Sequence, residues 1–399
     1  MRQFGILFFY ELKKIMQRKN TWITFGILLA LYLFVTGGRL LGSSYVDGEF
    51  LETHKEGFAI DKKNGERLSG RKLDDTLFEE MKEAYAGMED KERKYMLTEE
   101  YQTKVRPYSI IFNIVQFSDV NPFTVTEEQF YAARQAEVEK SWEEYKLTQG
   151  EKEYWQEKES KLEKPFTYYY AEGYDDLISM SGIYMVCLWV SFLIAICMSG
   201  VFTEEHGRKT DQLILCSRLG RKEIYFAKIL AGGLFSLLVA VFFLGIELLG
   251  VFTTYGSEEF STMLQLFYSA YSYPLTEGQV LFIMMDILLL AAVLTGIFTM
   301  VLSEMTKSNI GSMATVVVIL FLTRLVPIPI TWRFLSQIWN FFPLNILKLD
   351  AGFVDVRLVS LFGLKLTSWQ FVPVLYVVLA VLLVLVGKRV YCRYQVQGR

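Results

Sequence analysis

The sequence is poor in side chains that bind metals or form disulfides, with four cysteines and two histidines in 399 residues. Residues 42–177, the most polar part of the chain, contain no cysteine, so they must fold without disulfides. His54 and His206 are far apart in sequence, whereas a zinc site needs three or four ligands at suitable spacing. We therefore expect no metal site and interpret both histidines as structural. The cysteines are interpreted as small apolar packing residues: Cys187, Cys197, Cys216 and Cys392.

Signatures of catalysis and of nucleotide binding are also missing. There is no G-x-x-x-x-G-K-S/T loop, the motif whose backbone amides and lysine bind the phosphates of a nucleotide. The apolar segments hold no nucleophile with a neighbouring base and no set of metal ligands, which argues against an intramembrane enzyme. No basic tract resembles a nucleic-acid-binding surface. We therefore expect no catalytic residues, no cofactor and no nucleic-acid partner.

Apolar residues, by contrast, are abundant, and they occur in long uncharged blocks; 52% of the residues are apolar. A bilayer offers backbone groups no water, so only helices or closed barrels cross it. A crossing helix needs roughly 20 apolar residues to span about 30 Å of hydrocarbon. The blocks predict an all-α membrane protein whose six transmembrane helices cover residues 21–41, 178–202, 229–252, 280–303, 310–326 and 371–387.

Residues 1–20 combine apolar and basic side chains in a helical pattern. The apolar positions that recur at this spacing are Phe4, Leu7, Phe8, Leu12, Ile15 and Met16. The pattern predicts a cytoplasmic helix that lies in the membrane interface with its apolar face toward the lipid. The alternative is that these residues are only the basic flank of the first span.

The distribution of lysine and arginine predicts the orientation of the spans. These residues gather in residues 1–20, 203–228 and 388–399, whereas residues 253–279 contain none. Short cytoplasmic loops are enriched in lysine and arginine. We therefore expect a multi-pass protein of the cell membrane, with both termini in the cytoplasm. The lack of cysteine in residues 42–177 fits a bacterial surface.

This orientation places residues 42–177, which are rich in acidic side chains, outside the cell. Thr76 with Glu79 and Thr126 with Gln129 have the spacing of capping boxes, which begin helices. We therefore expect a helical extracellular domain. Its many aromatic residues either form its core or present a binding surface.

Residues 327–370 form a second predicted extracellular segment, too interrupted to be a span. Short interfacial helices are expected near residues 332–342, where Pro343 ends the helix, and near residues 345–351. The tryptophan content of this segment suits a membrane surface.

Three charged residues fall inside the predicted spans: Glu247, Asp286 and Arg324. A charge in hydrocarbon costs at least roughly 2.5–3.5 kcal/mol, so it is usually paired or hydrated. We expect Arg324 to pair with Glu247 or Asp286, or the acids to face a hydrated cavity. A role in the passage of substrate or ions is the alternative. The small residues at 232–233 and at 311–312 predict places where helices pack closely.

The most informative segment is the predicted cytoplasmic loop 203–228, with the sequence TEEHGRKTDQLILCSRLGRKEIYFAK. A short apolar run, Leu213, Ile214 and Leu215, lies between acidic and basic residues. Such a segment predicts a short amphipathic helix on the inner face of the membrane. Its apolar residues can bind in the groove of a partner protein.

This loop resembles the cytoplasmic loop of ABC-2 type transporter permeases. That family has an acidic residue after the second span, a turn, a leucine run, an arginine-containing turn and a lysine that opens the third span. The matching positions are Glu204 or Glu205, Gly207, Leu213 to Leu215, Arg218 or Arg221, and Lys228. Lys209 and Thr210 replace the family's Gly-Thr, and no proline precedes the arginine turn. The interfacial helix, the six spans and the large domain after the first span also match.

The resemblance implies a permease subunit of an ABC transporter, an exporter that pairs with a second permease subunit, identical or different. Separate ATPase subunits would bind ATP and magnesium and contact the loop. The residues expected to couple the ATPase to the spans are Glu204, Glu205, Arg208, Asp211, Leu213, Ile214, Leu215, Arg218 and Arg221. A different hypothesis remains open, a membrane-anchored sensor or immunity protein whose extracellular domain binds a peptide.

Overall fold

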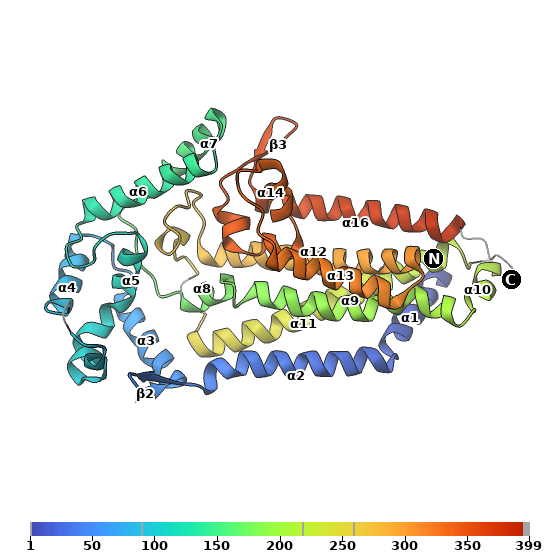
Figure 1. The fold of residues 1–399 in the computed structure, drawn as a ribbon, viewed down its shortest axis with the longest axis horizontal. Coiled ribbons are helices and arrows are strands. Elements are labelled where there is room, and N and C mark those ends of the chain that lie inside the picture. The colour runs from blue at the N-terminus through green and yellow to red at the C-terminus, as the bar shows by residue number, and fades with distance from the viewer. Residues whose placement is uncertain (1, 89–90, 218, 258–259, 394–399) are drawn as a thin grey trace.

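The computed structural model describes residues 2–88, 91–217, 219–257 and 260–393. Within these ranges, five helices are long and apolar enough to cross a membrane, and Figure 1 shows them side by side. They are α2 (Lys19–Leu41), α9 (Ile183–Gly207), α11 (Lys222–Tyr255), α12 (Glu277–Thr306) and α16 (Ser368–Arg393). Each coincides with one of the six predicted spans.

The fifth predicted span, residues 310–326, also forms an apolar helix, α13 (Asn309–Leu325), but this helix has only 17 residues. At about 1.5 Å per residue it is about 26 Å long, which is at the lower limit for crossing the hydrocarbon. The six-span count therefore stays a prediction that depends on α13.

Two helices run well past the predicted ends of their spans. Helix α9 continues to Gly207 rather than residue 202, and α11 begins at Lys222 rather than residue 229. The predicted spans end where charges begin, but Glu, Lys and Arg are good helix formers, so the helices continue. With 34 residues, α11 is about 51 Å long, well beyond the thickness of the hydrocarbon.

Helices α9 and α12 form the centre of the bundle. Of the residues in the most apolar part of α9, 72% are buried. The same fraction is only 6% for α2 and 17% for α16. Gly232 of α11 lies against Met300 of α12 with no room for a Cβ, so the predicted packing position at 232–233 is confirmed there. The prediction for 311–312 is wrong at Gly311, which lies only against Ser308 of its own helix cap.

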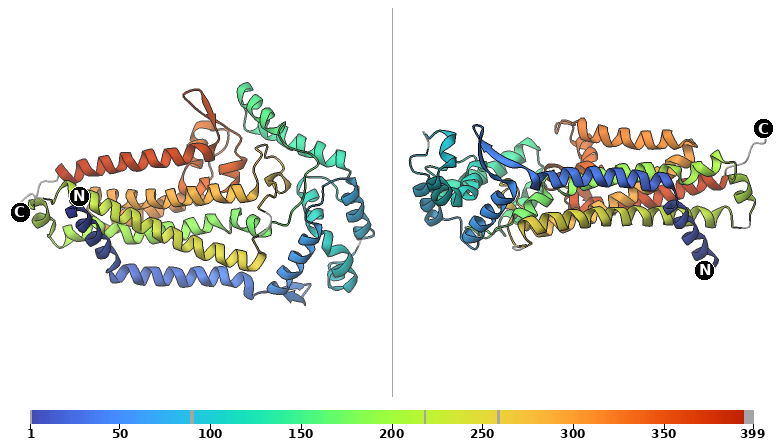
Figure 2. Two further views of the ribbon diagram at one scale, coloured as in Figure 1. Left: turned by 180° about the vertical axis from the view of Figure 1, so that it is seen from behind. Right: turned by 90° about the horizontal axis from the view of Figure 1, so that it is seen from below.

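Helix α1 (Arg2–Met16) is set at an angle to α2 (Figure 2, right). Its predicted apolar stripe does not face outward, because Phe8 and Leu12 pack against the bundle and Ile15 is buried. Most of the exposed apolar side chains are on the other side of the helix, Ile6, Phe9 and Tyr10, although Met16 of the predicted stripe is also exposed. An interfacial position for α1 therefore stays a prediction, with these exposed residues as the lipid-facing side.

Residues 43–170, which we call the insertion domain, lie beyond the end of the bundle opposite α10 (Figure 1, left). The domain is mainly helical but begins with a hairpin that was not predicted. Asp47 and Gly48 form its turn with φ of 49° and 85°, the geometry that an Asp-Gly pair favours between two strands. The elements are β1 (Ser43–Val46), β2 (Glu49–Thr53), α3 (His54–Leu68), α4 (Asp75–Tyr85), α5 (Ser109–Phe117), α6 (Glu127–Glu144) and α7 (Gln149–Glu159).

One of the two predicted capping boxes in this domain is confirmed in part, by its threonine cap. Thr126 caps α6 by accepting a hydrogen bond from the Gln129 amide nitrogen at 3.3 Å. Thr76, however, lies inside α4, which is capped by Asp74 through the amide nitrogen of Leu77 at 3.1 Å. Aspartate is as good a cap as threonine, and it comes first in the chain.

The segment between α13 and α16 folds back onto the insertion domain. The buried indole of Trp155 on α7 donates to the carbonyl oxygen of Val356 at 2.6 Å, and the amide of Leu358 donates to Glu151 Oε1 at 3.0 Å. Trp155 is thus a core residue, as are Trp142 and Val138. The segment contains α14 (Arg333–Asn340), α15 (Pro343–Ile346), β3 (Val359–Leu361) and β4 (Leu364–Leu366).

The remaining regular elements are short. Helix α8 (Glu172–Ile178) connects the insertion domain to α9. Single turns of 3-10 or π helix occur at Arg93–Leu97, Tyr101–Val105, Arg106–Tyr108, Leu264–Leu266 and Asp350–Val354.

Candidate functional site

The predicted amphipathic helix is present as α10 (Asp211–Cys216), at the end of the bundle where α1 begins and α16 ends (Figure 1, right). Leu213 is 76% exposed, whereas Leu215 is only 8% exposed and belongs to the main core. Ile214 is half-buried. The apolar run therefore divides into Leu213, which faces outward, and Leu215, which holds the helix against the bundle. Cys216 is exposed, so its interpretation as a packing residue is wrong.

Basic side chains surround α10. Arg208 lies just before it and Arg221 just after it, and both are exposed. Asp211 begins the helix, and Arg218 lies outside the described residues. An exposed leucine between cationic side chains can contact an apolar groove that has an acidic rim.

A buried ion cluster lies beneath this surface. Glu205 of α9 is 5% exposed, Lys228 of α11 is fully buried, and Glu205 Oε1 is 2.7 Å from Lys228 Nζ. Lys228 Nζ also lies 3.4 Å from Glu11 Oε2 of α1 and donates to the carbonyl oxygen of Val201 at 3.1 Å. Lys14 of α1 pairs with Glu205 as well. Two carboxylates and two ammonium groups thus neutralise one another and connect α1, α9 and α11.

The direction of the pKa shift of Lys14 reflects these ion pairs. Burial acts to lower the pKa of Lys14, but the carboxylates of Glu205 and Glu11 outweigh burial, so its pKa is raised. The cluster therefore keeps Lys14 charged throughout the physiological pH range.

The residues on either side of Glu205 make further connections. Glu204 Oε1 lies 3.3 Å from Arg18 Nε in the connection between α1 and α2, and the same arginine donates to the carbonyl oxygen of Gly200 at 3.2 Å. His206 Nε2 is 2.9 Å from Glu304 Oε2 at the end of α12. Three consecutive residues of α9 therefore contact three other parts of the bundle.

The structure divides the predicted site residues into two groups. Glu204 and Glu205 are bound within the bundle, whereas Arg208, Leu213 and Arg221 are on its surface. The partners that the sequence analysis did not find are Glu11, Lys14, Arg18 and Glu304. In the described part of the chain, no group of three or more His, Cys, Asp or Glu side chains could hold a metal ion. The arrangement is suited to transmitting motion between helices.

The hypothesis that Arg324 pairs with Glu247 or Asp286 is wrong within this chain. Glu247 is 3% exposed, accepts a hydrogen bond from Tyr32 of α2, and lies 3.8 Å from Arg39 Nη1. Asp286 is exposed on the surface of the bundle. Arg324 is also exposed, and its guanidinium carbon lies 5.7 Å from the ring centre of Tyr184.

A second group of carboxyls lies where the insertion domain joins the bundle, in α8. Burial raises the pKa of Glu172 from 4.5 to about 7, and burial also raises the pKa of Asp175 to about 6. Tyr170 donates to Glu172 Oε2 at 3.1 Å, which opposes the effect of burial only in part. The folded chain therefore holds protons that the unfolded chain releases.

The stability of the folded chain is expected to fall between pH 4.5 and pH 7. Below pH 4.5 Glu172 is protonated in both states; above it the unfolded chain loses the proton first, which costs the fold up to about 3 kcal/mol. Glu172→Gln should flatten this dependence, measured as the apparent melting temperature of the purified chain from pH 4.5 to 8. Curves of equal slope for the two proteins would contradict the assignment.

A bundle of long apolar helices is the architecture of an integral membrane protein. The family model described as "ABC-2 family transporter protein" matches residues 64–349, from α3 to the segment after α15. The chain belongs to this family, which comprises membrane components of ABC transporters, and the resemblance found in its sequence is confirmed. No curated protein and no solved structure matches the chain.

Proposed function

We propose that the chain is the permease subunit of an ABC exporter, which moves a substrate out of the cell while separate ATPase subunits hydrolyse ATP. The observation that carries the proposal is the position of α10. Its Leu213 is exposed for a partner, and the end of α9 just before it is joined to α1, α11 and α12 by ion pairs. ATP and magnesium belong to that partner, consistent with the missing phosphate-binding loop.

The ATPase contact is assigned to the exposed residues Arg208, Leu213 and Arg221 and to the half-buried Ile214, together with Asp211 and Arg218 by their place in the loop. Glu204 and Glu205 have a different role in this proposal. Their ion pairs with Arg18 and Lys228 pass a displacement of α10 to the helices that flank it. Leu215 keeps α10 attached to the bundle.

The orientation is part of the proposal. The end that carries α10 and both chain termini would be cytoplasmic, and the insertion domain would be extracellular. The lysines and arginines of residues 1–20, 203–228 and 388–399 support this assignment by the positive-inside rule.

A second permease subunit, identical or related, completes the transporter in this proposal. Helices α2 and α16 support it, because few of the residues in their apolar segments are buried in the single chain. Lipid or a partner subunit must cover these faces. Asp286 and Arg324, which find no ion-pair partner in the described residues, are placed to contact that subunit or the substrate path.

Affinity purification of the tagged chain from native membranes tests the proposal. We expect an ATPase with a phosphate-binding loop and a permease to co-purify in stoichiometric amounts. Recovery of a histidine kinase without an ATPase would instead support the sensor hypothesis. Recovery of the chain alone, under conditions that preserve other ABC transporters from the same membranes, would contradict the proposal.

A further inference from the structure

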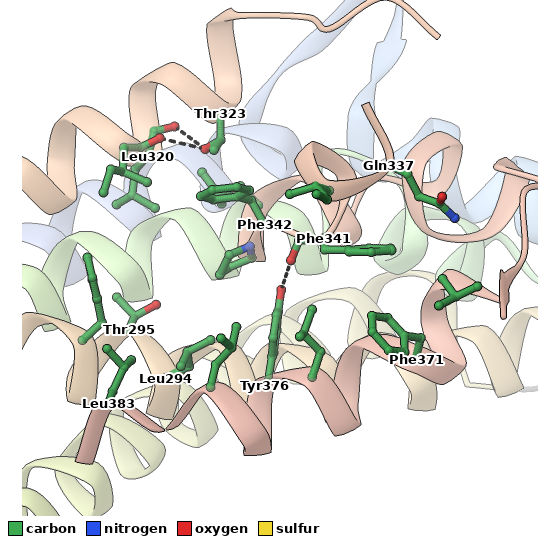
Figure 3. Close-up of a pocket in the computed structure, with 18 of the residues that line it drawn as sticks. Leu294, Thr295, Leu320, Thr323, Gln337, Phe341, Phe342, Phe371, Tyr376 and Leu383 are labelled. Carbon is green, nitrogen blue, oxygen red and sulfur yellow. Dashed lines mark hydrogen bonds between the residues drawn. The ribbon is translucent and has the colours of Figure 1, made fainter. Parts of the chain in front are cut away.

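A large apolar cavity opens between α13 and α16, with α12 as its floor and α14 and α15 at one end (Figure 3). Its volume is about 750 Å³, within the range of cavities that hold small molecules. Leucine and phenylalanine side chains supply most of the lining, including Leu294, Leu320, Phe341 and Leu383. Such a lining recognises hydrocarbon.

The length of the cavity matches one leaflet of a bilayer. The lining residues of α16 run from Phe371 to Leu383, which at about 1.5 Å per residue is about 18 Å. Half of a hydrocarbon layer about 30 Å thick is about 15 Å. A single extended acyl chain therefore fits along α16, and the outward-facing side chains of α16 and α13 place the opening against the membrane.

The α14 end of the cavity has a polar lining residue, and two cations outside the lining follow lining residues closely in the chain. Gln337 lines this end, and its amide nitrogen Nε2 is buried without an acceptor among the described residues. Neither Arg324 nor Lys348 lines the cavity, but Arg324 follows the lining residue Thr323, and Lys348 lies four residues after the lining residue Leu344. The two cations share the ring of Tyr184, at 5.7 Å and 5.9 Å from its centre.

Lys348 donates to Asn345 Oδ1 at 2.8 Å, and neither cation forms an ion pair within the described residues. Burial and then the charge of Arg324 lower the pKa of Lys348, and the carboxylate of Asp350 offsets only part of this. An anionic group at this end would relieve the repulsion between the cations. It would also supply an acceptor for the Gln337 amide.

We propose that the cavity binds one acyl chain of an anionic phospholipid, with its headgroup at Arg324, Lys348 and Gln337. The lipid is a bound component of the subunit in the leaflet next to α14. This inference goes beyond the proposed function and does not depend on the ATPase.

Native mass spectrometry of the purified full-length chain tests the inference, with phosphatidylglycerol and phosphatidylcholine of equal chain length as probes. Leu320→Trp fills the cavity, and Val318→Trp is the matched control, because Val318 is 53% exposed on the same helix. We expect the wild type and the control to retain phosphatidylglycerol in preference to phosphatidylcholine. Leu320→Trp should reduce its retention at least fivefold.

The headgroup contact has its own test, which does not require any change in the core. The double variant Arg324→Gln and Lys348→Gln should remove the preference for phosphatidylglycerol while phosphatidylcholine retention stays unchanged. Equal retention by Leu320→Trp and the wild type would overturn the inference. So would an unchanged preference in the double variant, or a Leu320→Trp protein that keeps its lipid but loses a second copy of the chain.

Discussion

Replacing Lys228 with methionine is expected to lower the free energy of unfolding by about 3 kcal/mol or more, the typical cost of breaking a buried ion pair. Methionine keeps the apolar stem of the side chain but removes the charge. Glu205 and Glu11 then share a buried site with Lys14 as the only cation of the cluster. The loss should be visible as a lower apparent melting temperature of the purified chain in detergent.

Two further variants distinguish a loss of stability caused by the ion cluster from a general effect of mutation. In the double variant Glu205→Gln and Lys228→Met, one charge of each sign is removed, so much of the lost stability should return. Lys222→Met changes an exposed lysine of the same helix and should alter stability by less than about 0.5 kcal/mol. A Lys228→Met protein as stable as the wild type, or strictly additive losses in the double variant, would show that the cluster is not coupled.

Replacing Leu213 with aspartate should reduce co-purification of the ATPase at least tenfold, a loss of about 1.4 kcal/mol of binding free energy. The carboxylate would be buried in the contact without a partner, a change that costs more than the loss of apolar area alone. Leu213 is 76% exposed in the free chain, so the fold itself should be unaffected. The ratio of ATPase to permease after purification measures the effect.

The controls use the same substitution elsewhere. Phe362 is 97% exposed in the turn between β3 and β4, toward the other end of the bundle, and Phe362→Asp should leave co-purification unchanged. Leu215→Asp should lower the stability of the permease, because Leu215 is in the core. If Leu213→Asp retains the ATPase as well as the wild type does, α10 is not the docking helix.

The long helices and the position of α10 could be predicted because both depend on local sequence patterns. Apolar blocks of about 20 residues have few alternatives in a membrane protein. The apolar run of Leu213 to Leu215 between charged residues favours a short amphipathic helix, whatever the surrounding tertiary structure. The hairpin at residues 43–53 was missed although Asp47-Gly48 is a strong turn signal, because helical spacing dominated the rest of the domain.

The ion pairs could not be predicted, because they depend on packing between distant segments. Lys14 and Glu205 are 191 residues apart, and no local pattern indicates that α1 lies beside the end of α9. Glu205 was therefore expected among the coupling residues without any sign that its carboxylate is buried. For the same reason, the sequence does not indicate the partners of Glu247. They are Tyr32 and Arg39, which are on the first span.

The predicted pairing of Arg324 failed for a related reason. The cost of a charge in hydrocarbon favours a pair between opposite charges, but it does not indicate which faces of the helices meet. In the fold, Arg324 and Asp286 are on the outside of the bundle, while Glu247 points between α11 and α2.

A photoreactive residue at position 213 tests most directly whether α10 receives the ATPase. p-Benzoylphenylalanine would replace Leu213 in one protein and the exposed Phe362 in a control, and both would be irradiated in native membranes. If α10 receives the ATPase, position 213 should form an adduct with an ATPase that carries a phosphate-binding loop, and position 362 should form no such adduct. An ATPase adduct from position 362 alone, or from neither position while the ATPase co-purifies, would contradict it.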